Sequence, residues 1–260
     1  MRYAEFLPAP DAGVFAERYW CLEGAGGGGG PILPDGHPEL VLHLGDRPSH
    51  LGVRQKASLF VAQMRTATTV AMQGEMSAWG IRLRPHMGRA IAGGLDQSRL
   101  AGSIHDAEGI CGASVRGLRE ALGNACDSAA RVRITDAWLR ARAEKPGSPV
   151  AGAALGLLPR LSVELTAARL GCTRRHLERV FGAEVGLSPR AWARIARMQS
   201  ALRVRDSNPG WTWADVAAEA GYADQPHLAL DFRQIAGTAP SRLLPGILSH
   251  SSKPDAAHSH

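Results

Sequence analysis

Three arginines in the C-terminal half, Arg174, Arg175 and Arg179, are spaced so that one short helix could present them together. Their guanidinium groups can bind phosphates and the O6/N7 edge of guanine. Thr173 precedes them and can cap a helix that begins at Arg174, with its hydroxyl on a free backbone amide. Glu178 lies between the last two arginines and adds an acceptor. The residues therefore predict a short outward helix of a kind that fits a DNA major groove.

The residues around these arginines have the pattern of a helix-turn-helix. A short helix precedes Gly171, which can end it in the left-handed conformation that other residues adopt only at a cost. The expected apolar face of this helix consists of Val163, Leu165, Ala167, Ala168 and Leu170. In the arginine-bearing helix, Leu177, Val180 and Phe181 fall at i, i+3 and i+4 and are expected to point inward. The inward stripe leaves the arginines on the outer face.

A second copy of the pattern follows, with the two candidate caps 224 − 173 = 51 residues apart. Its first helix covers residues 215–220 and ends at Gly221, and Asp224 is the candidate cap of the next helix. The expected inward stripe is Leu228, Phe232 and Ile235. The residues expected to be exposed are Gln225, His227, Leu230, Asp231 and Gln234. Between the copies, Ser188-Pro189 can open a long helix that Asn208-Pro209-Gly210 ends. Its expected apolar side carries Trp192, Ile195, Met198 and Leu202.

This region resembles the DNA-binding domain of the AraC/XylS transcription regulators, in which two helix-turn-helix units are joined by a central helix. The matching residues of the first unit are Leu177, Arg179, Phe181, Gly186, Ser188-Pro189, Arg197 and Ala201. Those of the second are Val216, Ala217, Gly221-Tyr222, Asp224, His227, Phe232-Arg233, Gly237 and Pro240. The resemblance spans roughly residues 150–245. It implies double-stranded promoter DNA and RNA polymerase as partners.

The residues expected to contact DNA are Thr173, Arg174, Arg175, Glu178, Arg179, Gln225, His227 and Arg233. Within this set Arg175 and Arg179 are expected to contact base edges, whereas Arg174 suits a phosphate or a structural role, as do Arg194 and Arg197. A salt bridge inside the domain is the expectation for Arg197.

The second unit departs from the family pattern on its reading helix. Leu230 stands where the family has a basic or polar residue, and Asp231 adds negative charge beside it. Pro226, Leu228 and Ala239 also replace residues that are common there. The second reading helix therefore looks chemically weak, and the first is expected to dominate DNA affinity.

Residues 1–95 carry strand patterns and residues 89–143 carry helix patterns, which predicts an α+β domain with a small antiparallel sheet or half-barrel. The expected strands cover residues 15–22, 39–44, 59–63, 68–73 and 79–83. The glycine-rich run Gly24–Gly30 lacks the Lys-Ser/Thr ending of a phosphate-binding loop and is expected to form a flexible surface loop. Residues 34–40 and 79–85 resemble the N-terminal domain of one AraC-like subgroup, which implies a β-rich sensory domain.

His37, Glu39 and His43 are the candidate ligand-binding residues of this sheet. Alternation along a strand places Glu39 and His43 on one face. Three interpretations stay open: ordinary turn and strand residues, polar contacts to a small molecule, or a metal site. Only one strand supplies the candidate ligands, so no metal and no cofactor are expected. A cupin-like enzyme domain is the unfavoured alternative, because no nucleophile-base pair, metal cluster or phosphate loop supports catalysis.

The composition is consistent with a DNA-binding protein. The 260 residues carry a formal charge of +6, and residues 148–249 contribute twelve arginines and no lysine against eight acidic residues, 12 − 8 = +4. Four scattered cysteines include no Cys-x-x-Cys pair, which argues against a zinc cluster or a disulfide framework. No signal peptide or membrane span is expected, so the protein is predicted to be cytoplasmic.

These patterns predict three segments. Residues 1–145 form a sensory or dimerisation domain, residues 148–248 an all-α DNA-binding domain, and residues 249–260 a disordered tail, with the linker at 144–149. The expected function is a sequence-specific transcription regulator under the control of a small-molecule effector in the N-terminal domain. A constitutive homodimeric regulator without a ligand is the alternative.

Overall fold

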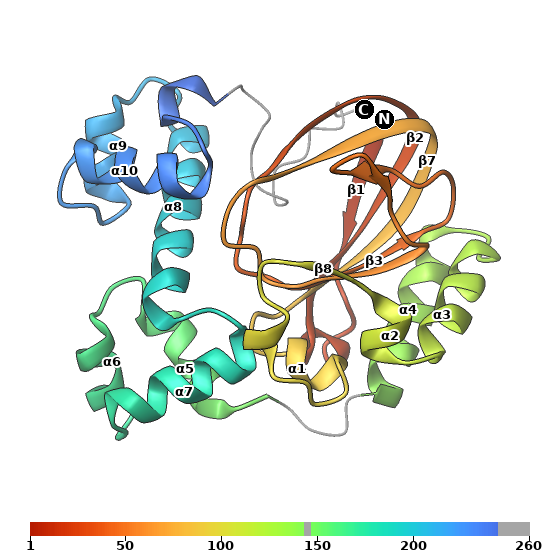
Figure 1. Cartoon of the computed structure of the whole chain (residues 1–260), viewed down its shortest axis with the longest axis horizontal. Helices are drawn as coiled ribbons and strands as arrows, with labels where there is room; N and C mark the ends of the chain where they lie inside the picture. The colour runs from red at the N-terminus through yellow and green to blue at the C-terminus, as the bar shows by residue number, and fades with distance from the viewer. Residues whose placement is uncertain (143–146, 244–260) are drawn as a thin grey trace.

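The computed structural model describes residues 1–142 and 147–243, and it contains a sheet-rich N-terminal part and a helical C-terminal part that lie side by side (Figure 1). The expected tail at 249–260 and most of the expected linker at 144–149 lie outside these residues. Across the described part of the chain, no helix combines the length and the apolar character needed to cross a membrane.

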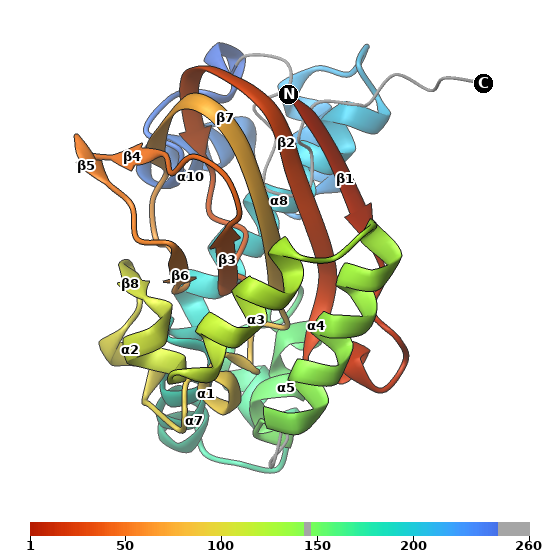
Figure 2. The same ribbon diagram turned by 90° about the vertical axis from the view of Figure 1, so that its right-hand side faces the viewer.

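An eight-stranded sheet forms the N-terminal part, with the strand order β1-β2-β7-β3-β6-β8 and all pairings between strands antiparallel. Strands β4 and β5 pair beside this path. The bounds are β1 Arg2–Phe6, β2 Ala16–Ile32, β3 Glu39–His43, β4 Ser49–His50, β5 Val53–Arg54, β6 Ser58–Val61, β7 Thr68–Leu83 and β8 Ile104–Asp106. Figure 2 shows β2 and β7 as two long, strongly curved neighbours. The sheet confirms the antiparallel N-terminal fold predicted from the sequence.

The glycine run belongs to a strand, and the prediction of a surface loop at Gly24–Gly30 was wrong. Strand β2 continues through all of these residues and pairs with β7 from Ala16 to Ile32. For the same reason the strands expected at 68–73 and 79–83 are one strand. The glycines allow close approach of the two backbones, since a Cβ atom at Gly29 would lie 2.3 Å from the Val70 carbonyl oxygen. A run of glycines lacks the side-chain alternation by which strands are recognised.

This close approach predicts a difference between two neighbouring glycines. We expect Gly29→Ala to destabilise the protein by about 1–3 kcal/mol, because its methyl group must push against the β7 backbone. Gly27→Ala is the matched control, since a Cβ atom there meets nothing within 4 Å. It should change the free energy of unfolding by no more than about 0.5 kcal/mol. Urea denaturation of both variants measures the difference, and equal midpoints would contradict the tight pairing.

One face of the sheet is covered by helices and holds the larger N-terminal core (Figure 2). The helices are α1 Gly88–Ile91, α2 Ala107–Cys111, α3 Ser114–Gly123 and α4 Ser128–Arg142, with short 3-10 turns η1 Ala12–Val14 and η2 Gln97–Arg99. Two buried hydrogen bonds tie α4 to the sheet. The Tyr19 hydroxyl donates to Asp136 over 2.7 Å, and Trp79 Nε1 donates to the Thr135 hydroxyl over 3.1 Å. The opposite face is therefore the one left to form other contacts.

The C-terminal part is all helical. Its elements are α5 Pro149–Leu157, α6 Val163–Arg169, α7 Arg174–Val185, α8 Pro189–Ser207, α9 Trp213–Glu219, α10 Gln225–Ile235 and the 3-10 turn η3 Pro240–Arg242. They share one apolar core. The expected apolar face of α6 was partly wrong, because Leu165 is 60% exposed and Ala168 is also exposed. This seven-residue helix buries a narrow edge formed by Thr166 and Ala167.

Candidate DNA interface and ligand cavity

Helix α6 ends and helix α7 begins as the sequence predicts. Gly171 has φ +64°, and the Thr173 hydroxyl accepts a hydrogen bond from the His176 backbone amide over 3.1 Å. Leu177 and Phe181 are fully buried. The buried stripe fixes the rotation of α7, so that its N-terminal turn faces solvent.

Not all of the charged residues on this turn are equally available. Arg174 is held by two carboxylates, with Nη1 2.6 Å from Glu164 Oε1 and Nε 2.8 Å from Glu178 Oε1. Arg175 is exposed and forms no ion pair with any residue in the described ranges. Arg179 is exposed as well. Among the described residues, Arg174 is therefore held by ion pairs within the protein, whereas Arg175 and Arg179 are not.

His176 was missed by the sequence reasoning. It is exposed on the same turn, and its Nδ1 lies 3.4 Å from Arg179 Nη2. The spacing i, i+3 places two side chains on one helix face. That spacing was a signal from which His176 could have been added to the candidate set.

The second unit is built in the same way. Gly221 has φ +78°, and Asp224 Oδ1 accepts from the His227 backbone amide over 2.7 Å, so both predicted helix-end residues are in place. The His227 ring meets Tyr222 edge-on at 5.4 Å and is partly buried. Gln225 and Arg233 are exposed on α10. This helix therefore offers fewer accessible donors than α7.

Asp231 is not exposed, and that prediction was wrong. Only 1% of the residue is accessible, and its Oδ1 lies 2.7 Å from Arg194 Nη2 on α8. Asp231 follows Leu228 by three positions and precedes Phe232, which places it at the edge of the buried stripe. Its charge is compensated inside the domain, whereas Leu230 next to it is 49% exposed.

Arg194 and Arg197 on α8 both have contacts within the domain. Arg194 holds Asp231, in agreement with the structural role considered for it. The Arg197 guanidinium lies over the Tyr222 ring at 5.4 Å, and no salt bridge of Arg197 occurs among the described residues. A cation–π contact thus takes the place of the expected ion pair.

The two reading helices lie at opposite ends of α8 (Figure 1). A helix of 19 residues is about 28 Å long. Successive exposures of the major groove on one side of DNA are about 34 Å apart. Two helix-turn-helix units at the ends of a central helix of comparable length give the C-terminal part the architecture of a DNA-binding domain.

Comparison with known proteins agrees with this class. Residues 166–245 match a family described as a helix-turn-helix domain, which is of the AraC type. The sequence resemblance is thereby confirmed for this part of the chain. Residues 4–106 match a domain of unknown function (DUF6597). These matches support a DNA-binding transcription regulator. No curated protein matches the chain.

Similar solved structures include those of two bacterial proteins. The C-terminal domain of AraT, a response regulator from Geobacillus stearothermophilus, is 20% identical and covers 44% of this chain and 93% of its own, with a TM-score of 0.35. ToxT from Vibrio cholerae is 8% identical and covers 93% of this chain and 97% of its own, with a TM-score of 0.47. ToxT bound to (E)-4-(8-methylnaphthalen-1-yl)but-3-enoic acid is 10% identical over the same shares, with a TM-score of 0.44.

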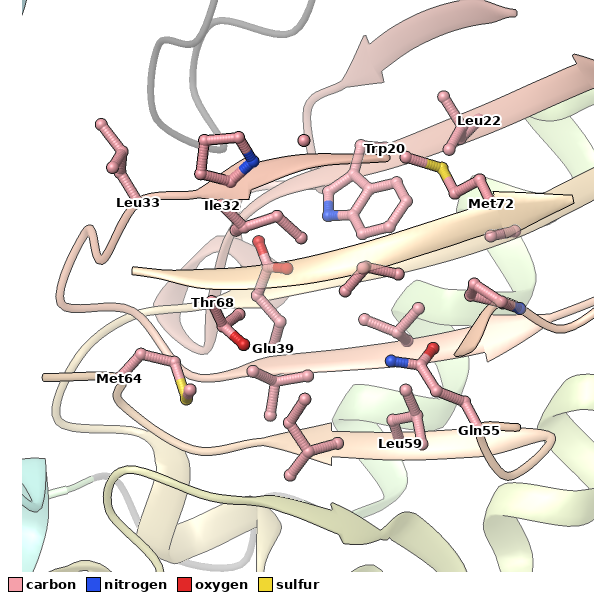
Figure 3. Close-up of a pocket in the computed structure, with 18 of the residues that line it drawn as sticks. Trp20, Leu22, Ile32, Leu33, Glu39, Gln55, Leu59, Met64, Thr68 and Met72 are labelled. Carbon is pink, nitrogen blue, oxygen red and sulfur yellow. The ribbon is translucent and has the colours of Figure 1, made fainter. Parts of the chain in front are cut away.

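The sheet face away from α3 and α4 carries a cavity of about 320 Å³ (Figure 3). Most of its lining is apolar, from Trp20 and Leu22 on β2 to Val70 on β7. His37, Glu39 and His43 all line it. The structure therefore places all three candidate ligand-binding residues at one cavity, with Glu39 and His43 on one face of β3 as alternation indicates and His37 before this strand.

One end of the cavity is polar. Asp35 and Glu39 both line it, and both approach Arg82, whose Nε lies 3.4 Å from Asp35 Oδ2 and 3.2 Å from Glu39 Oε1. Burial alone would lower the pKa of Arg82, but these two carboxylates raise it above its ordinary value. Burial would also lower the pKa of His37, but the nearby carboxylates of Asp35 and Glu17 outweigh this effect and raise the pKa. The sequence reasoning missed Arg82, which lies 43 residues from Glu39 in the chain.

His43 lies at another part of the cavity wall. Burial lowers its pKa to about 4, so the imidazole is neutral at pH 7. Its Nε2 lies 3.1 Å from Gln55 Oε1. Within the described ranges, no three His, Cys, Asp or Glu side chains are grouped so that they could hold a metal ion. The mostly apolar lining with a few polar side chains is the kind that suits an organic ligand.

The same segment that lines the cavity contacts the DNA-binding domain. Leu33 and Pro34 line the cavity, and Leu33 is also buried in the C-terminal core. Gln199 on α8 donates a hydrogen bond to the Pro34 carbonyl over 2.6 Å. A second contact joins the Ala67 amide, just before β7, to the Ile235 carbonyl at the end of α10 over 2.7 Å. The central helix α8 and the second helix-turn-helix unit therefore both touch segments next to the cavity.

Proposed function

We propose that the protein is a transcription regulator whose DNA binding is controlled by a small molecule in the N-terminal cavity. Residues 148–248 would bind double-stranded promoter DNA, and residues 1–145 would sense the effector. The proposal of effector control is supported by the segment from Leu33 to Gly36, which lines the cavity on one side and packs against α8 on the other. RNA polymerase as a partner and a homodimer belong to the same proposal.

On the DNA side, Arg175 and Arg179 would contact base edges. Glu178 would act as an acceptor beside them, and Arg174 and Thr173 would position the helix or meet phosphates. The C-terminal end of α7 is anchored to the N-terminal domain, since Arg89 Nη1 lies 3.1 Å from Glu184 Oε1. The arginine-bearing turn lies at the other end of this helix. The sensory domain would then hold the C-terminal end of the first reading helix and leave its N-terminal turns accessible to DNA.

Within α10, the residues that would contact DNA are Gln225, His227 and Arg233. Arg233 and Gln225 are exposed, whereas the ring of His227 is partly covered by Tyr222. Leu230 offers only an apolar contact. The second unit would thus add phosphate contacts and a small number of base contacts to the affinity set by the first.

Footprinting of the full-length protein on its own upstream DNA, at two salt concentrations, tests the function. We expect two protected segments about one helical turn apart that persist at the higher salt concentration. Binding that is only non-specific and is lost with salt would contradict the regulator function. The same assay with a panel of small apolar compounds tests effector control. An occupancy that no compound changes would favour the constitutive regulator.

A substitution at Gly36 tests the connection between the cavity and α8. Gly36 has φ +81°, and a Cβ atom there would lie 2.8 Å from Trp192 Nε1 on α8. We expect Gly36→Ala to weaken DNA binding about fivefold or more, because α8 sets the relative position of both reading helices. Gly52→Ala is the matched control, with φ +76° and open space around the added methyl group. Titration of labelled DNA measures both, and equal affinities would show that the contact does not reach the DNA-binding site.

A further inference from the structure

The two reading helices are built in the same register, 51 residues apart. Helix α7 begins at Arg174 and α10 at Gln225, each directly after its capping residue, 225 − 174 = 51. A fully buried leucine-phenylalanine pair and a glycine with positive φ recur at the same offset. They are Leu177, Phe181 and Gly186 in the first unit and Leu228, Phe232 and Gly237 in the second. Each residue of α10 therefore has a counterpart on α7 that lies at the same position of its helix.

The N-terminal domain also contacts the two helices at equivalent positions. Arg89 Nη1 lies 3.1 Å from Glu184 Oε1 near the end of α7. The Ala67 amide donates to the Ile235 carbonyl over 2.7 Å at the end of α10. Glu184 and Ile235 are again counterparts, 235 − 184 = 51. Because both helices are held at the same end, the outward face of α10 can be identified from that of α7.

The outward face of α10 is apolar where that of α7 is charged. The counterparts of Arg175, Glu178 and Arg179 are Pro226, Ala229 and Leu230. With 3.6 residues per turn, Pro226 and Leu230 lie opposite the buried stripe of α10, and both are exposed. Pro226 suits the first turn of a helix because its φ is fixed. Leu230 is 49% exposed and does not belong to the apolar core of the domain, so its side chain is available for a contact outside the chain.

An apolar side chain at such a position can distinguish one base in the major groove. Guanine, adenine and cytosine present only hydrogen-bonding groups there, whereas thymine adds a C5-methyl group. Burial of this methyl group against a leucine removes apolar surface from water, which is favourable. The polar edge of a guanine or cytosine would instead lose its water without gaining a hydrogen bond. Leu230 therefore favours thymine, whereas Arg175 and Arg179 favour guanine.

The polar residues of α10 are compatible with this contact. Gln225 can form two hydrogen bonds to N6 and N7 of adenine, the base that pairs with thymine. Arg233 is exposed three positions after Leu230 and can bind a phosphate. The carboxylate of Asp231 is 1% exposed in its residue and is paired with Arg194 over 2.7 Å. The charges that α10 itself carries therefore do not oppose contact with DNA.

We propose that the second reading helix recognises thymine through its C5-methyl group, with Leu230 as the side chain in contact, while the first recognises guanine. One chain would then bind an asymmetric site, with a guanine in one segment and a thymine in the other, about one helical turn apart. The inference names the base read by the second unit and therefore rests on the function proposed above.

Replacement of thymine by deoxyuridine in the protected DNA tests the contact, because uracil lacks only the methyl group and still pairs with adenine. Duplexes that carry the replacement in one protected segment at a time are titrated with the full-length protein at fixed salt. We expect the replacement in one segment to weaken binding about three- to fivefold for each contacted methyl group. In the other segment it should change the affinity by less than about twofold. Tolerance of deoxyuridine in both segments overturns the proposal.

Leu230→Ala assigns the methyl contact to its side chain. This variant should bind the thymine duplex about three- to fivefold more weakly than the wild type and should lose nothing further on the deoxyuridine duplex, because both changes remove the same contact. Leu7→Ala removes a leucine that is 70% exposed in the N-terminal domain and should bind both duplexes as the wild type does. Losses that multiply when Leu230→Ala meets deoxyuridine overturn the assignment. Thermal unfolding checks that both variants keep the fold.

Leu230→Arg tests the base preference in the opposite direction, since α7 has an arginine at the counterpart position. Exchange of the methyl-sensitive T·A pair for G·C should weaken wild-type binding about fivefold or more. The variant should bind the G·C duplex at least as tightly as the T·A duplex, because arginine can form two hydrogen bonds to guanine. A variant that keeps the preference for thymine overturns the proposal.

The footprint distinguishes this inference from the proposed function. A specific footprint whose affinity is insensitive to every deoxyuridine replacement contradicts the thymine contact and leaves the regulator function standing. Absence of any specific footprint contradicts the regulator function and the thymine contact with it. A Leu230→Ala protein that binds both duplexes as the wild type does, but supports less transcription with RNA polymerase in vitro, would assign Leu230 to a protein contact and overturn the proposal.

Discussion

Arg175→Ala/Arg179→Ala is expected to weaken sequence-specific DNA binding at least about 30-fold, because each arginine bound to a guanine edge contributes about 1–3 kcal/mol of base discrimination. Both side chains are exposed on the first turns of α7, and neither is held by a carboxylate among the described residues. Arg174, by contrast, already has two acidic partners. The loss should therefore be concentrated in two residues of the first reading helix. Titration of labelled upstream DNA at fixed salt measures it.

A variant with the same change of charge separates base recognition from general electrostatics. Arg99→Ala/Arg133→Ala removes two exposed arginines of the N-terminal domain. Its effect on specific binding should stay within about threefold, because the removed charges are not at the DNA interface. Circular dichroism and thermal unfolding of both variants confirm that the fold is retained. Equal losses in the two variants would mean that α7 contributes only charge and that its assignment as the main reading helix is wrong.

The helix-turn-helix units could be predicted because their signals are local. Thr173 and Asp224 cap helices that begin at the next residue, and Gly171 and Gly221 adopt the left-handed conformation two or three positions earlier. Each signal depends on a hydrogen bond or a dihedral angle within a few residues. Such features can be recognised from a short window of sequence without knowing the tertiary structure.

The features that were missed depend on partners that are distant in the chain. Asp231 is buried because Arg194, 37 residues away, supplies a compensating charge. Gly29 is a strand residue because β7 lies against it, and no side chain of its own indicates that pairing. In both cases the sequence near the residue favours the opposite conclusion. Only the packed structure decides between a solvated acid and a buried one, or between a loop and a strand.

The cavity could be predicted from the sequence only in part. Alternation along β3 placed Glu39 and His43 on one face before any tertiary contact was known, and the structure shows both at the same cavity. The opposite walls come from β2 and β7, whose length and curvature depend on the glycine run. Arg82 was not a candidate, because its position on β7 beside β3 follows from the strand order alone.

Arg82→Met should therefore have the largest effect on stability in the N-terminal domain. Arg82 is 2% exposed, and its removal leaves the carboxylates of Asp35 and Glu39 without their shared cation. Loss of one partner from a buried ion pair typically costs about 3–5 kcal/mol, since the remaining charge stays out of water. We expect a loss of that size in the free energy of unfolding measured by urea denaturation.

Arg18→Met provides the matched control, because Arg18 is the register partner of Arg82 on β2 and also forms an ion pair. Its side chain is 43% exposed, so its contact with Glu5 over 3.2 Å should contribute no more than about 1 kcal/mol. Adding Glu39→Gln to Arg82→Met removes one of the two carboxylates that lost this cation and should restore part of the lost stability. If Arg82→Met costs no more than Arg18→Met, or if the second substitution restores nothing, then Asp35 and Glu39 do not depend on Arg82.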